Sequence, residues 1–235
     1  MLSDLILEMN NVSKKYSLDV MFHRSLREDM MRLFRNRGGG LQENEFWALK
    51  DVSFSVRRGE AIGIYGHNGA GKSTILKMLA GITQPTFGTF LIQGRVAPLI
   101  EIGAGFHPDL TGRENIMMNG AILGMKIPEI RQKFNSIVEF SELGSFIEMP
   151  VKKFSSGMYL RLAFSIAIHS DADVYLIDEI ISVGDSEFQS KCISKIQELK
   201  SRGKTLIIIS HSLDLLKQLT SSIVFLEKGH VVTHV

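Results

Sequence analysis

The stretch Gly66–Thr74 limits what this chain can fold into more than any other part of the sequence. It reads Gly-His-Asn-Gly-Ala-Gly-Lys-Ser-Thr and fits the pattern G-x-x-x-x-G-K-[ST] of a phosphate-binding loop. Such a loop needs a buried strand before it and a helix after it. Ala61–Tyr65 is a short apolar run that predicts the strand, and Ile75–Ala80 predicts the helix. A glycine-rich turn that matches by accident is the alternative interpretation.

The residue types in this loop are suited to binding an anion. Its glycines let several backbone amides converge on a phosphate, and the following helix directs its positive end to the same place. Lys72 is expected to reach the β- and γ-phosphates of a nucleotide, and the Ser73 hydroxyl to ligate Mg²⁺. The nucleotide-binding residues expected in the loop are His67, Asn68, Gly69, Ala70, Gly71, Lys72, Ser73 and Thr74.

Length and composition exclude several classes of protein. The 235 residues can form one large domain or two small ones, and a net charge of +2 is too close to balance for wholesale nucleic-acid binding. Cys192 is the single cysteine, so no internal disulfide is possible and a reducing cytosol is favoured. It shares a helical stripe with Phe188, Ile196 and Leu199, which predicts a core thiol. No signal peptide or bilayer-spanning run is present, so work on a membrane is expected to require a partner.

Strands and helices alternate in the second half of the chain, which predicts a parallel sheet covered by helices. Before them, a helix-rich stretch at about 105–168 is expected to project as a subdomain, and Thr111–Glu114 forms a capping box within it. The predicted strands are Leu5–Met9, Asp51–Val56, Thr89–Gln93, Arg95–Glu101, Val174–Ile177, Leu206–Ser210 and Ser222–Leu226, and the later helices are Ser186–Ser201 and Leu213–Leu219.

A basic amphipathic segment, Tyr16–Glu45, lies between the first two predicted strands. Its apolar residues recur at helical spacing, and within 23–37 five arginines stand against Glu28 and Asp29, a net charge of +3. Such a helix suits an anionic membrane surface or a docking partner. Packing against its own domain with a solvated face is an equal alternative.

Two carboxylates follow the apolar strand Val174–Ile177. Asp178 is placed to hold Mg²⁺ at the carboxyl end of a buried strand, and Glu179 to act as general base on an attacking water. By itself, an apolar strand that ends in Asp-Glu carries little weight because such strands are common.

Three further features are compatible with the same chemistry. Ser155–Met158 opens a predicted helix and can form a second anion site, or an ordinary N-cap. His211 follows a predicted strand and can reach a γ-phosphate, although a lone histidine there is usually structural. Trp47 can stack on adenine, although a core aromatic is the commoner use.

In this order, these residues resemble the nucleotide-binding subunit of ABC transporters, and the resemblance covers essentially the whole chain. It implies a single α/β domain over 1–235: a P-loop NTPase of the ABC ATPase type, with a mostly parallel sheet flanked by helices, an N-terminal antiparallel β part and an inserted helical subdomain. It implies the cofactors ATP and Mg²⁺ and an ATP-dependent homodimer with two nucleotides at the interface.

The resemblance also assigns roles to particular residues. Gly66–Thr74 is similar to the Walker A loop, Asp178 to the Walker B aspartate, Glu179 to the catalytic carboxylate and His211 to the switch histidine. Ser182–Asp185 is similar to the D-loop. Ser155, Ser156, Gly157 and Met158 resemble the signature motif, which contacts the ATP held by the opposite subunit.

Three stretches resemble one subgroup, the ATP-binding subunits of bacterial exporters of O-antigen, capsule or teichoic acid: Glu101–Asn115, Ser155–Met158 and Gly184–Cys192. This implies a transmembrane permease subunit of the ABC-2 type, a lipid-linked glycan handled by the complex, and a peripheral position on the cytoplasmic face of the bacterial inner membrane. Some members carry a C-terminal glycan-binding domain. The chain stops at Val235, so an exporter type without that domain, or a truncated chain, is expected.

The sequence departs from the family pattern at two positions. Glu101 stands where most members have the glutamine that touches Mg²⁺, so the expected metal ligands are Ser73, Asp178 and Glu101. Ser156 replaces a glycine of the signature. The alternatives left open are an exporter ATPase for another substrate such as a drug or lipid, a soluble nucleic-acid-linked ABC ATPase, and a binding module whose ATP is structural.

Overall fold

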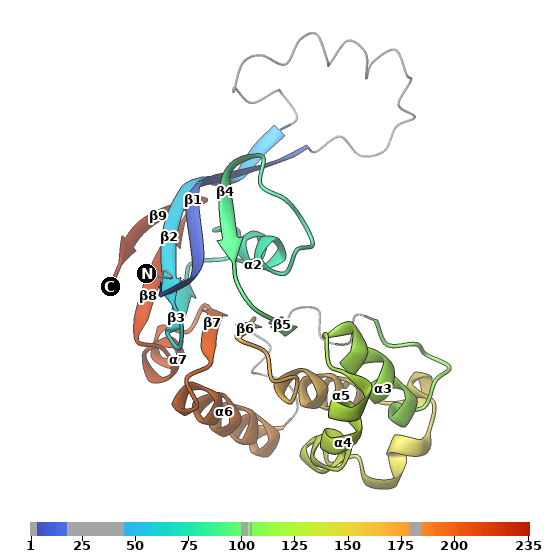
Figure 1. Cartoon of the computed structure of the whole chain (residues 1–235). Coiled ribbons are helices and arrows are strands. Elements are labelled where there is room, and N and C mark those ends of the chain that lie inside the picture. The colour runs from blue at the N-terminus through green and yellow to red at the C-terminus, as the bar shows by residue number, and fades with distance from the viewer. Residues whose placement is uncertain (1–3, 18–44, 100–102, 104, 179–184) are drawn as a thin grey trace, which may run out of the picture.

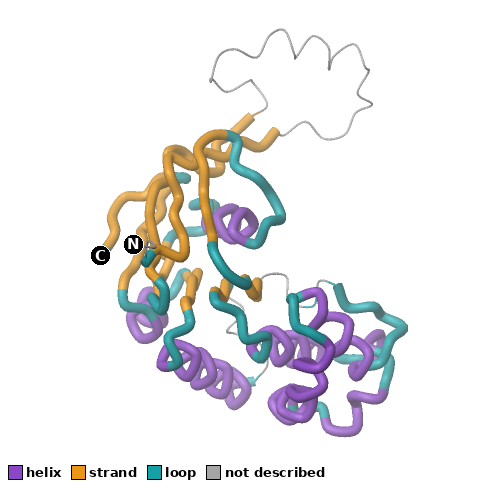
Figure 2. The backbone as a smooth tube through the Cα atoms, viewed as in Figure 1, coloured by secondary structure: helices purple, strands orange, loops and turns teal. Residues whose placement is uncertain are grey.

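The computed structural model describes residues 4–17, 45–99, 103, 105–178 and 185–235. In this part of the chain two sheets lie side by side, and a group of helices stands apart from them (Figure 1). The backbone trace in Figure 2 shows the strands gathered in one half and most of the helices in the other. No helix in these ranges is both long and apolar enough to cross a bilayer.

The smaller sheet is antiparallel. Its strands are β1 (Leu5–Ser17), β2 (Glu45–Arg57) and β4 (Phe87–Ile92), in the order β2-β1-β4. β1 continues beyond the predicted Leu5–Met9. Bulges interrupt the alternation of its side chains, and Asn11 adopts a φ of 48°, so the sequence pattern did not indicate the second half of the strand. Tyr16 pairs with Phe46 and Ser17 with Glu45, so the ends of the segment predicted as an amphipathic insertion are strand. Its remainder, 18–44, lies outside the described residues.

The larger sheet has the strand order β5-β6-β7-β3-β8-β9. Every pair is parallel except β8 with β9, as the β/α alternation of the sequence predicts. The final hairpin strand was not predicted. The strands are β3 (Ala61–Tyr65), β5 (Val96–Leu99), β6 (Val174–Ile177), β7 (Thr205–Ser210), β8 (Ser222–Glu227) and β9 (His230–His234).

Helix α2 (Lys72–Leu79) is covered by both sheets. Its buried side chains, among them Ile75 and Leu76, share one apolar core with the inner face of the antiparallel sheet and with alternate residues of the parallel strands, such as Ile62 and Ile64. Burial on both sides explains why the helix is held firmly after the phosphate-binding loop: each fully buried aliphatic side chain contributes about 1.5–3 kcal/mol.

The opposite face of the parallel sheet is covered by α6 (Ser186–Ser201), α7 (Leu213–Leu219) and the end of α5 (Ser156–Ile168). Cys192 is buried there among Phe188, Ile196 and Leu199, which confirms the predicted core thiol.

The inserted helices have a core of their own. α3 (Gly112–Ile122), α4 (Ile127–Ser141), two 3₁₀ turns (Gly144–Glu148 and Val151–Lys153) and α5 pack around Ile116, Ile130 and Ile166. Thr111 and Glu114 form the predicted capping box at the start of α3. This block lies at lower right in Figure 1, away from β3 and α2.

Candidate functional site

The loop Gly66–Gly71 connects β3 directly to α2, as the motif requires. His67, Asn68 and Gly69 are exposed, whereas Gly66 and Ala70 are buried. Ser73 and Thr74 belong to the first turn of α2, where backbone amides lack partners within the helix. The loop therefore presents an open strip of backbone to solvent at a helix N-terminus.

Glycine is required in this loop because the backbone passes close to other segments. A Cβ on Gly66 would lie 2.5 Å from the Leu226 carbonyl oxygen, and one on Gly71 would lie 2.5 Å from the carbonyl oxygen of Ala48. Gly71 also has a φ of 106°, a conformation that side chains disfavour. The loop is thus pressed against β2 and β8 on one side, while Gly69 on the other has nothing within 4 Å of an added Cβ. This shape fits a phosphate group.

Lys72 folds back over the loop. Its ammonium donates to the Gly66 carbonyl oxygen at 2.7 Å and to that of His67 at 3.2 Å, and the residue is 7% exposed. A buried ammonium needs hydrogen-bonding partners of this kind. Because the lysine stem is flexible, the same ammonium can turn toward an anion held in the loop.

Asp178 and His211 lie at the same edge of the sheet as the loop. Asp178 directly follows β6 and is half-buried, and His211 directly follows β7 and is exposed. β7 lies between β6 and β3, and Tyr65 at the end of β3 pairs with Ser210. Asp178 and the loop are therefore two strand spacings apart, about 10 Å. That distance leaves room for a phosphate with a metal ion.

This geometry can hold magnesium. Asp178 and the exposed Ser73 hydroxyl offer the oxygen ligands that Mg²⁺ takes from proteins when substrate phosphates and water supply the others. Among the described residues no three His, Cys, Asp or Glu side chains gather as a metal site. The other two acidic residues predicted here, Glu101 and Glu179, lie outside the described residues, as do 182–184 of the predicted D-loop.

Trp47 is half-buried on β2, with the Lys15 ammonium 5.4 Å from its ring centroid and the Phe87 ring 6.1 Å away. It borders a cavity of about 250 Å³. The next residue, Ala48, is the one whose carbonyl oxygen faces Gly71. The backbone of the predicted adenine-stacking residue is therefore next to the phosphate-binding loop.

Gly229, which no motif in the sequence singled out, joins the phosphate-binding loop to the strand next to it. In the turn between β8 and β9, the Gly229 amide donates to the Ala70 carbonyl oxygen at 3.0 Å, and the Gly229 carbonyl oxygen accepts from the Lys50 amide at 2.8 Å. Gly229 thus connects the loop to the strand that carries Trp47. The Lys228-Gly229 pair is a turn signal, but its two partners are far away in sequence.

The predicted signature residues are at the start of α5, in the helical block. Ser155 is the N-cap, and its hydroxyl accepts from the Met158 amide at 3.2 Å. Ser155 and Ser156 are exposed, and a Cβ on Gly157 would meet only the Ser155 hydroxyl, at 3.9 Å. The structure does not group these residues with the phosphate-binding loop of the same chain (Figure 1).

Asp185, the last residue of the predicted D-loop, is the N-cap of α6. Its carboxylate accepts from the Phe188 amide at 2.9 Å. This hydrogen bond, more than the neighbouring Arg161 charge, holds the pKa of Asp185 below its usual value.

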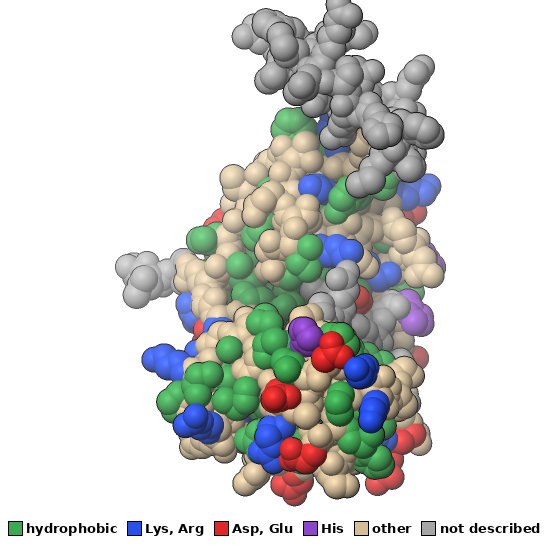
Figure 3. Space-filling view, turned by 90° about the vertical axis from the view of Figure 1, so that its right-hand side faces the viewer, with side chains coloured by type: hydrophobic (Ala, Val, Ile, Leu, Met, Phe, Trp, Pro, Cys, Tyr) green, Lys and Arg blue, Asp and Glu red, His purple; other side chains and the backbone are tan. Residues whose placement is uncertain are grey.

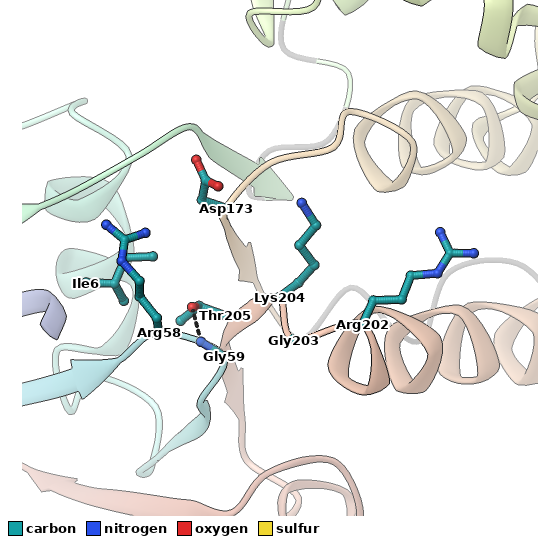
Figure 4. A pocket seen from close by; sticks show the side chains of 8 residues that line it. All are labelled: Ile6, Arg58, Gly59, Asp173, Arg202, Gly203, Lys204 and Thr205. Atoms are coloured by element: carbon teal, nitrogen blue, oxygen red, sulfur yellow. Dashed lines mark hydrogen bonds between the residues drawn. The ribbon is translucent and has the colours of Figure 1, made fainter. Parts of the chain in front are cut away.

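A second cavity, of about 200 Å³, lies at the opposite ends of the same strands (Figure 4). Asp173 precedes β6, Thr205 begins β7, and Gly59 precedes β3 and donates to the Thr205 hydroxyl at 2.9 Å. Arg58, Arg202 and Lys204 surround the opening. Since ligands of open α/β sheets bind at the carboxyl ends of the strands, this cavity is not the nucleotide site.

Known proteins of similar sequence identify the family. Residues 49–182 match the family ABC transporter. The chain is 40% identical to an O-antigen export system ATP-binding protein, RfbB, of Klebsiella pneumoniae, over 94% of this chain and 90% of that one. It is 42% identical to the teichoic acids export ATP-binding protein TagH of Listeria monocytogenes, over 94% of this chain and 64% of that one. It is 41% identical to RfbB of Myxococcus xanthus, of which it spans 48%.

Solved structures show the same fold. The ATP-binding cassette MJ0796, in a dimeric state bound to ADP and Pi, superposes with a TM-score of 0.76 at 21% identity over 97% of both chains. The ATP-binding subunit of an ABC transporter superposes with a TM-score of 0.77 at 23% identity, over 98% of this chain and 89% of that one. The α/β architecture predicted from the sequence is confirmed, and the chain belongs to the ABC transporter family.

Proposed function

We propose that this chain is the ATP-binding and ATP-hydrolysing subunit of an exporter that moves a lipid-linked polysaccharide of the O-antigen, capsule or teichoic acid type across a bacterial cytoplasmic membrane. One observation carries the proposal. A phosphate-binding loop, Asp178 and His211 lie at the same edge of one sheet. The chain that carries them is 40–42% identical, over 94% of its length, to ATP-binding proteins named for O-antigen and teichoic acid export.

The chain's own residues divide the work at this edge. The loop amides and Lys72 hold the β- and γ-phosphates, Trp47 stacks on the adenine, and Asp178 with Ser73 holds the metal. Mg²⁺, when bound, neutralises charge that develops on the phosphate oxygens. Glu179 takes the proton of the water that attacks the γ-phosphorus, while the bond from this phosphorus to the β,γ-bridging oxygen breaks and ADP leaves with that oxygen. His211 donates a hydrogen bond to an oxygen of the γ-phosphate, which becomes inorganic phosphate.

Two chains complete each site. Ser155–Met158 stand at an exposed helix start in the block that projects from the sheet, where they can meet the nucleotide of a second copy. The likeness of the fold to a dimeric cassette supports this arrangement. A nucleotide favours closure because only the closed pair offers both sets of contacts.

The proposed partner is a permease of the ABC-2 type, and the chain works at the cytoplasmic face of the inner membrane. Exposed large apolar side chains support a surface on the helical block to which the permease docks: Ile122 is 61% exposed, Phe146 51% and Ile127 44%. Figure 3 views this side of the molecule, on which apolar and charged side chains are interspersed.

The test uses the chain co-purified with its permease and reconstituted in vesicles. Lipid-linked O-antigen or teichoic acid polymer is expected to stimulate ATP hydrolysis and to cross the bilayer, and Lys72→Ala is expected to abolish both. Stimulation by a drug or a simple phospholipid but not by any glycan polymer would contradict the substrate class. Stimulation by nucleic acid without any membrane partner would contradict the role in export.

A further inference from the structure

The cavity of about 200 Å³ at the amino ends of β3, β6 and β7 is built on closely packed backbone (Figure 4). A Cβ on Gly59 would lie 3.2 Å from the Gly203 carbonyl oxygen, so the two glycine turns that line the cavity are in contact. The Thr205 hydroxyl accepts from the Gly59 amide at 2.9 Å, and Thr205 is 1% exposed. The base of the cavity therefore does not depend on long, mobile side chains.

Two cations at this cavity, Arg58 and Lys204, form no ion pair with any carboxylate of the described residues. The Arg58 guanidinium donates to the Gln93 side-chain oxygen at 3.1 Å, a neutral partner that orients the guanidinium and leaves its charge in place. The pKa of the nearby Asp171 is lowered mainly by its hydrogen bond from Lys133 and less by the charge of Lys204, so this acid already has a cation.

Asp173 provides an acceptor at the same cavity. Its Oδ2 accepts from the Arg95 amide at 2.7 Å, which fixes the carboxylate, and no described residue donates to its Oδ1. The Thr205 hydroxyl still has a proton to donate, because it accepts from Gly59 and no described residue accepts from it. Figure 4 shows Arg58, Asp173 and Lys204 on the same side of the strand ends. The cavity thus combines two cations, one carboxylate acceptor and one hydroxyl donor.

These groups select a class of ligand. Two cations favour a phosphate monoester, which carries a charge of about −1.5 to −2 at neutral pH, over the less charged diester of a lipid headgroup or polymer. Asp173 repels a bare phosphate but accepts from a ligand that also carries hydroxyl groups. Arg202 is already paired with Glu198 at 2.5 Å and adds little. The volume is below the roughly 300–1,000 Å³ of pockets for drug-sized ligands, so the ligand is small.

We propose that this cavity binds a small phosphorylated polyol, whose phosphate lies between Arg58 and Lys204 and one of whose hydroxyl groups donates to Asp173. The Thr205 hydroxyl donates to the same ligand. This inference goes beyond the proposed function. β3, β6 and β7 lead to the nucleotide-binding residues at their carboxyl ends, whereas this site is at their amino ends. It takes its ligand without ATP, magnesium or the permease.

The experiment titrates the purified chain with glycerol 3-phosphate and follows the backbone amides by NMR, with ADP and Mg²⁺ in excess to fill the phosphate-binding loop. The amides of Gly59 and Lys204 should shift saturably. Arg58→Met and Lys204→Met should each lower the affinity about tenfold or more, the loss expected for one charge-assisted hydrogen bond. Lys153→Met, which removes an exposed lysine of the helical block, is the matched control and should bind normally.

Three comparison ligands test the chemical class. Inorganic phosphate, glycerol and the diester glycerophosphoglycerol should each bind about tenfold more weakly than glycerol 3-phosphate. Equal affinity for inorganic phosphate would show an adventitious ion only and overturn the proposal, and tighter binding of the diester would overturn it as well.

The variants test the location. Unchanged affinity in both Arg58→Met and Lys204→Met, or no amide shift up to about 10 mM ligand, would overturn the proposal. If Lys204→Met does not fold, unchanged affinity in Arg58→Met alone would overturn it, because Arg58 is exposed and its loss leaves the fold intact. None of these measurements requires ATP hydrolysis, so their failure would leave the proposed function standing.

Discussion

Replacing Gly229 with alanine tests whether the turn between β8 and β9 holds the phosphate-binding loop against β2. A Cβ at this position would lie 2.9 Å from the Ala48 carbonyl oxygen and 3.2 Å from the Ala48 carbonyl carbon and the Leu49 Cα. All three are backbone atoms, so no side-chain rotation relieves the contact. Gly229 also has a φ of 82°, which alanine disfavours.

The expected magnitude has two parts. The left-handed backbone costs alanine roughly 1–2 kcal/mol, and an unrelieved overpacking contact costs about 1–3 kcal/mol more. Gly229→Ala should therefore lower the free energy of unfolding by about 2–5 kcal/mol, a large share of the ~5–15 kcal/mol typical of a folded domain. The folded fraction should also bind ATP more weakly, because Ala70 and Lys50 are displaced from one another.

Gly203→Ala is the matched control. Gly203 has a φ of 74°, but nothing lies within 4 Å of its added Cβ. It should lose only the backbone part, roughly 1–2 kcal/mol, and bind ATP like the wild type. Urea unfolding measures both variants, and calorimetric titration at low temperature measures ATP affinity. Equal losses of stability in the two variants would refute the role assigned to the close approach of Gly229 to the backbone of Ala48 and Leu49.

Three further predictions concern single side chains. Trp47→Ala should weaken ATP binding by about tenfold, because stacking of a base on an aromatic side chain is worth roughly 1–3 kcal/mol. The binding of inorganic triphosphate, which has no base, should not change. Equal losses of affinity for both ligands would argue against adenine stacking. Burial lowers the pKa of His169 below 6.5, so the unfolded chain binds more protons than the folded chain. The free energy of unfolding should therefore fall as the pH drops below 6.5. Urea unfolding at several pH values should show a weaker fall in His169→Gln than in the wild type. Burial raises the pKa of the Cys192 thiol to about 12, so a disulfide reagent at pH 8 should label the chain only after denaturant is added; rapid labelling of the native chain would show that this thiol is accessible.

Local patterns in the sequence predicted much of this molecule. The phosphate-binding loop lies between a strand and a helix as its motif requires, Thr111 and Glu114 form the capping box, and Cys192 lies in the core. Each of these depends on residues within a few positions of one another, where steric and hydrogen-bonding rules act directly.

Long-range features escaped prediction. The bulges of β1 disrupt the alternation by which strands are recognised, so its length was underestimated. The contact of Gly229 with Ala70 and the bridge from Arg161 to Asp185 join residues that only the folded chain brings together. The roles of Glu101 and Glu179 stay predictions, because both residues lie outside the described part of the chain.

Nucleotide titration of the purified chain tests the central claim most directly, because Trp47 is the chain's single tryptophan and reports on its own site. With Mg²⁺ present, ATP should change Trp47 fluorescence saturably in the wild type and in Glu179→Gln, while Lys72→Ala should respond only at far higher concentrations. Glu179→Gln should then retain the bound ATP that the wild type cleaves. An undiminished response in Lys72→Ala, or no response in the wild type, would contradict the account.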